Sequence, residues 1–183
     1  MKKLLVILAL GLFLSTNTTM ANEEVKFDIV YKNEIYEIRK YSERLVAQAI
    51  NDKDNTTFRK LFNYISGANN SSKKIKMTTP VTQTKNNNVS FMQFYLPSKF
   101  NKTTTPIPSN SDVKITLMKE GYFAAISYSG RSSDKNFTKY SKILREKLLK
   151  DKILINGFAI KATYNPPWTL PLFRRNEVMF NVK

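Results

Sequence analysis

The sequence predicts an α+β domain built from two similar β-α-β-β halves. Segments with alternating apolar and polar residues precede an amphipathic helical stretch and two more strands, and the same order then repeats. Ile38 and Ala47 are nine residues apart, as are Ile115 and Ala124 at the matching points of the second half. Each half alone would leave one face of its helix and sheet in water. We therefore expect the halves to pack together as one antiparallel sheet with two helices.

The first predicted helix spans residues 56–66. Its apolar residues recur with i, i+3, i+4, i+7 spacing, which places them on one face. Asn55 or Thr56 is a suitable N-cap, and Gly67 supplies the left-handed residue that often follows a helix. Residues 75–81 are then expected to form a strand with its exit at Pro80. The four apolar helix positions are Phe58, Leu61, Phe62 and Ile65.

A second helix is predicted to begin near Ser132 or Ser133, again with one apolar face. The stretch 97–112 is rich in Pro, Ser, Thr and Asn, which indicates an ordered surface loop; it is not a domain linker, because the halves on either side look alike. The apolar face of the second helix contains Phe137, Tyr140, Leu144 and Leu148. Further strands are expected at residues 27–31, 36–41, 45–50, 89–96, 113–117, 122–127, 158–164 and 177–182.

Residues 1–21 have the pattern of a secretory signal peptide. Lys2 and Lys3 precede the apolar run 4–14, and Thr19-Met20-Ala21 provides a small-x-small cleavage site. The run is short for a membrane span, although a retained membrane anchor is the competing interpretation. We expect residues 22–183 to form a single exported domain, in a bacterial periplasm or otherwise secreted. With no Cys in the chain, that domain has no disulfides and depends on packing.

The absence of both His and Cys limits the chemistry of the chain. It removes most zinc sites, Cys–His pairs and Ser–His–Asp triads, as well as the two commonest protein ligands of haem iron. Carboxylates such as Glu177, next to Arg174 and Arg175, have simpler roles as ion pairs. We therefore expect no enzyme, with a carboxylate pair assembled only by the fold as the alternative.

The formal net charge of +16 attracts anionic partners, although solubility and a Lys- and Asn-rich composition are the favoured explanation for it. The basic residues are scattered, without a basic helix or an aromatic-interleaved basic stripe, so no specific nucleic-acid binding is expected. Weak contact with an anionic membrane surface is compatible with this charge. We expect the protein to be a monomer.

Four motifs resemble those of the SOUL haem-binding protein family. They are Y-E-I-R-x-Y at residue 36, F-x-x-L-F-x-Y-I-x-G-x-N at residue 58, K-I-x-M-T-T-P-V at residue 74 and Y-x-P-P followed by R-R-N-E-V at residue 164. The resemblance implies the family's duplicated fold, a distorted antiparallel barrel-like sheet with a helix from each half. It also implies non-covalent binding of haem or another tetrapyrrole.

The resemblance further implies a ligand cleft between the first helix and the loop 164–173. Phe58 and Phe62 match helix positions that face a porphyrin in haem-binding relatives, whereas for Leu61, although it is a candidate contact, a plain core role is favoured. The full set of candidate ligand contacts is Phe58, Arg59, Leu61, Phe62, Trp168, Leu170 and Arg174.

The chain departs from the family where haem propionates are contacted. The basic side chains of the relatives are replaced by Asn55, Asn63 and a position near Thr169, so Arg59, Lys60, Arg174 and Arg175 are the available substitutes. A ligand of the iron would have to be Met, Tyr, Lys or solvent, and the side-chain candidates are Met77 and Tyr64. Met77 is more typical of a core strand position, and Tyr64 lies off the apolar helix face and is expected to be exposed.

Our preferred hypothesis is therefore reversible tetrapyrrole binding without a His ligand, for carriage or buffering. One alternative keeps the fold as an effector-binding module for another hydrophobic molecule. The other is an interaction protein that uses its basic surface on envelope lipids or a partner.

Overall fold

The computed structural model describes residues 23–51, 56–86 and 89–183. The expected signal peptide and the candidate cap Asn55 lie outside the described residues. None of the helices in the described ranges is long and apolar enough to cross a membrane.

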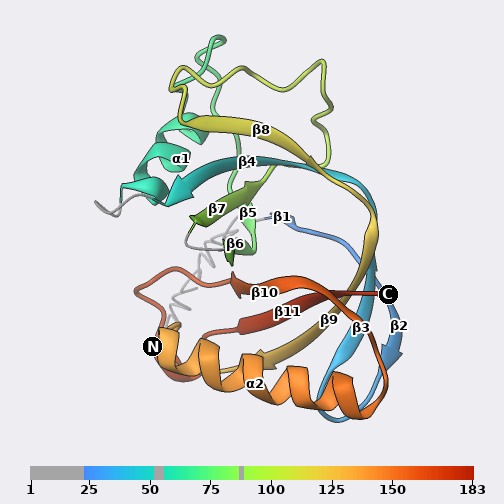
Figure 1. Ribbon diagram of the computed structural model, residues 1–183. Helices are drawn as coiled ribbons and strands as arrows, with labels where there is room; N and C mark the ends of the chain where they lie inside the picture. Colours follow the sequence, from blue (N-terminus) through green and yellow to red (C-terminus); the bar gives the residue numbers. More distant parts are fainter. Residues whose placement is uncertain (1–22, 52–55, 87–88) are drawn as a thin grey trace, which may run out of the picture.

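Nine antiparallel strands form one curled sheet that carries two helices, which confirms the predicted α+β class (Figure 1). The strand order is β2-β3-β9-β11-β10-β6-β7-β4-β8. The helices are α1 (Thr57–Ile65) and α2 (Asp134–Lys150), each packed against its own half of the sheet. The strands are β2 (Asp28–Lys32), β3 (Glu37–Tyr41), β4 (Arg44–Asn51), β6 (Val81–Asn86), β7 (Val89–Tyr95), β8 (Val113–Met118), β9 (Gly121–Tyr128), β10 (Ile155–Thr163) and β11 (Asn176–Val182).

The two halves exchange their first strands. β3 of the first half pairs with β9 of the second, and β8 of the second half pairs with β4 of the first. The repeated nine-residue spacing reappears in these ladders, because Ile38 lies opposite Ala124 and Ile115 lies opposite Ala47. The internal duplication predicted from the spacing is thus present as matching strand registers.

Strands β6 and β10 join the halves at the centre of the sheet. Thr82 pairs with Ala162 and Thr84 pairs with Ile160, so each half contributes one strand to the seam. Thr82 and Ala162 are 1% and 0% exposed, so the face of the seam to which their side chains point is buried.

Each helix covers a separate apolar cluster. Leu61 and Phe94 belong to the cluster under α1, and Leu144 and Phe180 belong to the cluster under α2. A third cluster, which includes Phe123, lies on the other face of the second half, since successive side chains of a strand point to opposite faces.

The predicted helix boundaries agree with the structure. Thr56 occupies the N-cap position of α1, and Gly67 after its end has a φ of +120°. The hydroxyl of Ser133 accepts a hydrogen bond from the backbone N–H of Asn136 and caps α2.

The strand predicted at residues 75–81 is for the most part not present in the structure. Only β5 (Thr78–Thr79) is a strand there, and it pairs in parallel with β1 (Glu23–Glu24) at the amino end of the described chain. Pro80 separates it from β6, which belongs to the main sheet and was not predicted. The sequence of β6, V-T-Q-T-K-N, has a single large apolar residue and therefore shows no apolar alternation.

Replacing a central aromatic residue should expose how much the α2 cluster contributes. We expect Phe180→Ala to lower the free energy of unfolding by about 3–5 kcal/mol, because Phe180 is fully buried and its loss leaves a cavity. Leu154→Ala is the matched control; at 68% exposure it should change stability by less than about 0.5 kcal/mol. Urea unfolding followed by circular dichroism measures both values, and equal effects would contradict this description of the core.

Candidate ligand-binding cleft

A cleft of about 1110 Å³ opens between α1 and the loop 164–175, which joins β10 to β11 over the β6–β10 seam. This loop contains the short 3-10 helix η1 (Pro171–Phe173). Figure 1 shows α1 and the loop projecting on the same, left-hand side of the molecule. Small-molecule pockets commonly measure ~300–1,000 Å³. The cleft is therefore large enough for a ligand with several rings.

Two stacked phenylalanines of α1 form one wall of the cleft. The rings of Phe58 and Phe62 have centroids 6.0 Å apart and planes that differ by 13°. They are 45% and 48% exposed, although they belong to an apolar helical stripe. Phe94 supports Phe58 with a ring contact at 5.3 Å and 64°. A flat apolar ligand would thus meet a pre-positioned aromatic surface.

Leu61 and Tyr64 lie on the core-facing side of α1. The structure places Leu61 in the core instead of the cleft, with no exposed surface. Tyr64 is 1% exposed and not at the surface as predicted. Its hydroxyl donates a hydrogen bond of 2.9 Å to the carbonyl of Pro106, and burial raises the pKa of the phenol to about 12. The reason is that the apolar stripe of α1 is wider than its contact with the sheet: Leu61, Tyr64 and Ile65 are buried, whereas Phe58 and Phe62, one turn apart, lie at the outer edge of the stripe.

The floor of the cleft is apolar and comes from the first half of the chain. Met77, Val81 and Met92 line it, and Thr79 and Gln83 add polar groups. Met77, a candidate iron ligand, is therefore on the cleft surface, whereas Tyr64, the other candidate, is not. Within residues 23–51, 56–86 and 89–183, no cluster of three His, Cys, Asp or Glu side chains could hold a metal ion.

The loop forms the second wall through Pro166, Pro167 and Trp168. Trp168 is 82% exposed, so its ring stands at the mouth and not deep in the cleft. Leu170 is 65% exposed and lies outside the lining, contrary to its predicted role.

Three cations line the cleft, and only Arg174 was predicted from the sequence. Its guanidinium donates hydrogen bonds to the carbonyls of Thr169, at 2.7 Å, and Pro167, so it holds the loop in shape. Lys161 lies on the seam strand β10, with its Nζ 3.3 Å from a carboxylate oxygen of the exposed Asp134. Arg131 precedes α2 and forms no ion pair within the described part of the chain. Arg59, another predicted contact, is exposed and does not line the cleft.

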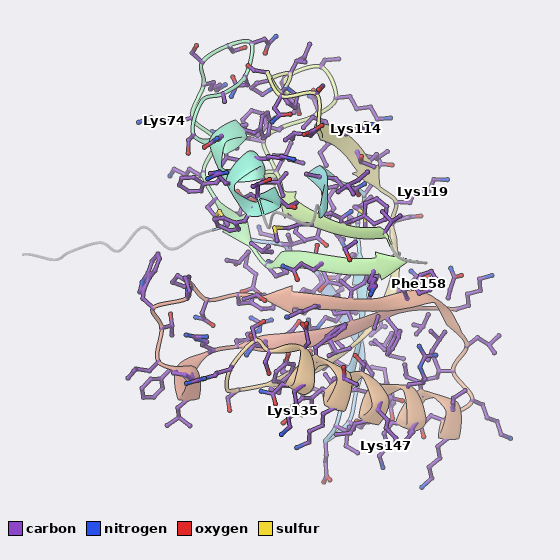
Figure 2. All side chains as sticks on the ribbon, turned by 60° about the vertical axis from the view of Figure 1, so that its left-hand side comes forward. Lys74, Lys114, Lys119, Lys135, Lys147 and Phe158 are labelled. Carbon is purple, nitrogen blue, oxygen red and sulfur yellow. The ribbon has the colours of Figure 1, made fainter. Side chains whose placement is uncertain are left out.

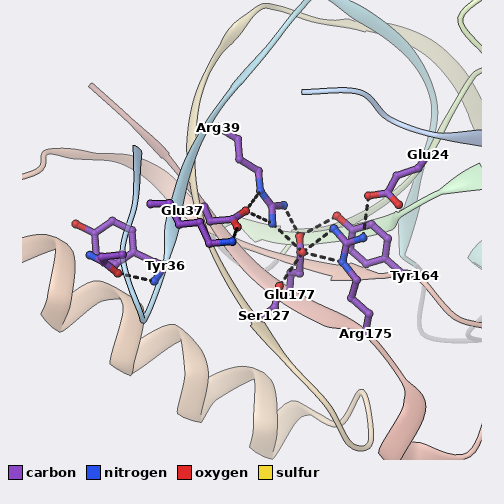
Figure 3. A network of polar contacts seen from close by, with 10 residues as sticks. Glu24, Tyr36, Glu37, Arg39, Ser127, Tyr164, Arg175 and Glu177 are labelled. Atoms are coloured by element: carbon purple, nitrogen blue, oxygen red, sulfur yellow. Dashed lines mark hydrogen bonds and ion pairs between the residues drawn. The ribbon is translucent and has the colours of Figure 1, made fainter. Parts of the chain in front are cut away.

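A buried carboxylate anchors the loop end of β10 (Figure 3). Tyr164 lines the cleft, and its hydroxyl donates a hydrogen bond of 2.8 Å to Glu177, which has no exposed surface. Arg39 binds both oxygens of Glu177 at 2.7 and 3.0 Å, and Arg175 binds it at 3.0 Å. The Arg175–Glu177 pair was predicted from the sequence, but Arg39 was not, because it lies 138 positions away along the chain.

The charge balance keeps Glu177 ionised. Burial alone would raise the pKa of its carboxyl, but the hydrogen bonds and charge of Arg39, with the charge of Arg175, outweigh it and lower the pKa. Ser127 donates a further hydrogen bond of 2.9 Å. All these donors occupy the carboxylate, so it holds Tyr164 in place and is not available as a general base.

Taken together, an apolar cleft with a stacked aromatic wall and a few cations defines a small-molecule-binding module of the α+β class. The chain belongs to the SOUL heme-binding protein family, whose model matches residues 22–181. A mouse (Mus musculus) protein named Heme-binding protein 2 is 32% identical over 162 residues, which cover 78% of this chain and 76% of the mouse protein.

Two solved structures share the fold at low sequence identity. An uncharacterised conserved protein from Listeria innocua has a TM-score of 0.63 at 8% identity and covers 83% of this chain and 94% of its own. A hydrolase from the same organism has a TM-score of 0.61 at 9% identity, with 84% and 94% covered. At such identities the likeness shows the fold alone.

Glu177→Gln should destabilise the protein at neutral pH. We expect a loss of about 3 kcal/mol, because the substitution removes the fully buried one of the two carboxylates that pair with Arg39 and leaves only Glu37. Glu120→Gln, at an exposed position, is the control and should be close to neutral. Urea unfolding at pH 7 makes the comparison.

The pH dependence of stability should change as well. In the folded protein the pKa of Glu177 lies below the ordinary carboxyl pKa of 4.5. Its ionised form therefore contributes fully to the folding stability above pH 4.5, and this contribution is lost as the pH falls through the folded pKa. Stability measured from pH 7 downward should therefore decline less steeply below pH 4.5 in Glu177→Gln than in the wild type. Parallel curves would mean that the carboxylate is not stabilised as described.

Proposed function

We propose that the protein binds haem or a related tetrapyrrole reversibly and non-covalently in this cleft, as a carrier or buffer. The observation on which the proposal rests most directly is the stacked Phe58–Phe62 wall facing Pro167 and Trp168 across an open cleft. Membership of a heme-binding family and the mouse relative's name point to the same ligand class.

The residues present fit a flat, apolar ring system with anionic edges. Burial of apolar surface contributes about 25 cal/mol for each Å², and the cleft surface is chiefly aromatic, aliphatic and proline side chains. Arg131 and Lys161 provide positive charge for carboxylates of the ligand. They come from the second half of the chain, at positions other than the family's basic positions on the first helix.

Iron coordination by a side chain is not required in this proposal. With no His or Cys in the chain, the thioethers of Met77 and Met92 are the sulfur atoms that line the cleft. Haem would supply the redox-active iron, whereas the chain supplies apolar contact and charge complementarity. Binding of this kind is weaker than axial ligation and suits release to another acceptor.

We further propose that the protein is an exported monomer and not an enzyme. The inventory of residues supports a binding role, because the best-placed buried carboxylate, Glu177, already has four donors: Arg39, Ser127, Tyr164 and Arg175. The charge pattern of residues 1–21 supports export.

Another hydrophobic ligand is the second candidate. Arg174 is bound to loop carbonyls and Lys161 to Asp134, which leaves Arg131 as the freest cation of the lining. The single anionic group of an amphiphile would pair with Arg131 as well as a dicarboxylate would. Competition of hemin with a panel of fatty acids and aromatic acids discriminates between the two classes.

The first test is a hemin titration followed by absorbance and by quenching of Trp168 fluorescence. We expect a saturable one-to-one complex, and Phe58→Ala and Phe62→Ala should each weaken it by about tenfold, because each removes half of the aromatic wall. Phe158→Ala is the matched control, since Phe158 is 43% exposed near the other end of β10 (Figure 2). Non-saturable partitioning, or equal losses in all three variants, would exclude a specific site.

The second test concerns the iron. Met77→Leu keeps the apolar volume but removes the thioether, so we expect the spectrum of the hemin complex and its Kd to stay unchanged within about twofold. A shifted spectrum with weaker binding would show that Met77 is a ligand.

A further inference from the structure

The loop between β10 and β11 exposes a cluster of large apolar side chains next to the cleft mouth. Trp168, Leu170, Leu172 and Phe173 are 82%, 65%, 74% and 70% exposed. Apolar residues exposed one at a time are common, but four within six positions form a patch that usually marks a docking surface. We call residues 168–173 the apolar tip.

The apolar tip is held in shape by its own hydrogen bonds. Thr169 donates to the carbonyl of Pro166 at 3.1 Å, and Phe173 donates to the carbonyl of Leu170 at 2.9 Å. The carbonyl of Pro171 accepts a bond of 2.8 Å from Gly130, which ties the tip to the start of α2. Satisfied carbonyls lower the cost of moving a loop out of water.

The prolines of the loop also lower the cost of moving it out of water. Pro166, Pro167 and Pro171 have no N–H groups to desolvate, and they restrict the backbone before any partner is met. Arg174 closes the loop from inside through its bonds to two carbonyls. The exposed side chains are therefore presented by a pre-organised loop.

The surroundings of the apolar tip are positively charged. No acidic residue occurs in residues 164–175. Arg131 and Lys135 lie on the adjoining segment, where the nearby carboxylate of Asp134 is paired with Lys161. Arg59 is exposed on α1 across the cleft.

From these observations we propose that the apolar tip docks the cleft mouth onto an anionic lipid bilayer. Trp, Leu and Phe flanked by Arg and Lys are the composition that partitions into the interfacial layer, where rings enter the acyl boundary and cations meet lipid phosphates. An apolar ligand could then move between bilayer and cleft with little exposure to water. The docking itself does not depend on which ligand the cleft binds.

Trp168 is the only Trp of the chain, so its fluorescence reports on the apolar tip directly. The full-length protein is mixed with vesicles of phosphatidylethanolamine and phosphatidylglycerol, and separately with phosphatidylcholine vesicles. With the anionic vesicles we expect a blue-shifted emission that brominated lipids quench and that added salt weakens. Phosphatidylcholine should give a much smaller shift.

Two pairs of variants separate the apolar tip from general basic attraction. The double variant Leu172→Asn/Phe173→Asn should lower the vesicle partition coefficient about tenfold or more. Leu149→Asn/Leu154→Asn is matched in exposure, at 64% and 68%, but lies at the other end of α2 and should bind like the wild type.

For the charge, Lys135→Gln, near the apolar tip but outside the cleft lining, should weaken binding more than Lys147→Gln, whose side chain lies in the last turn of α2 (Figure 2). Hemin titration of every variant without vesicles shows whether the cleft is intact, so failure of docking and failure of the proposed ligand give different results. Unchanged Trp168 emission with anionic vesicles, or equal loss in both double variants, would overturn the proposal. If the apolar tip binds a protein and not a bilayer, Trp168 emission should stay unchanged with anionic vesicles.

Discussion

The antiparallel pairing of β6 with β10 is the contact on which the rest of this molecule depends. It joins two duplicated halves that have each exchanged a strand with the other, and it places residues of both beneath one cleft. Val81 and Met92 come from the first half, and Lys161 and Tyr164 come from the second. Neither half alone has both walls. A binding site at the seam is therefore a direct consequence of the duplication.

The two walls of the cleft are stabilised in different ways. The helix wall is held by apolar packing, because Leu61 anchors α1 in its core and leaves Phe58 free to face outward. The loop wall is held by polar groups, since the buried Glu177 fixes Tyr164 and Arg39 compensates the buried charge. Buried ion pairs of this kind stabilise little in net terms but strongly favour one geometry, which is what a pre-formed site needs.

The fold class and the helices could be predicted from the sequence because strand alternation and helical spacing are local signals, whereas the two walls of the cleft were predicted from the resemblance to the SOUL family. Sequence reasoning missed β6, whose polar sequence conceals a buried central strand, and it misplaced Leu61 and Tyr64, whose side of the helix depends on where the sheet packs. The partnership of Arg39 with Glu177 could not be predicted from spacing either. It depends on β3 and β11 both pairing with β9, which is a property of the whole topology.

The central claim, that the seam cleft holds the ligand, can be tested at single positions by NMR of methionine methyl groups. Met77 and Met92 line the cleft, whereas Met118 and Met179 lie outside it. Paramagnetic hemin should broaden the methyl signals of Met77 and Met92 at one equivalent and leave the other two nearly unchanged. Broadening of Met118 or Met179 with sharp signals from Met77 and Met92 would place the ligand elsewhere and contradict this interpretation.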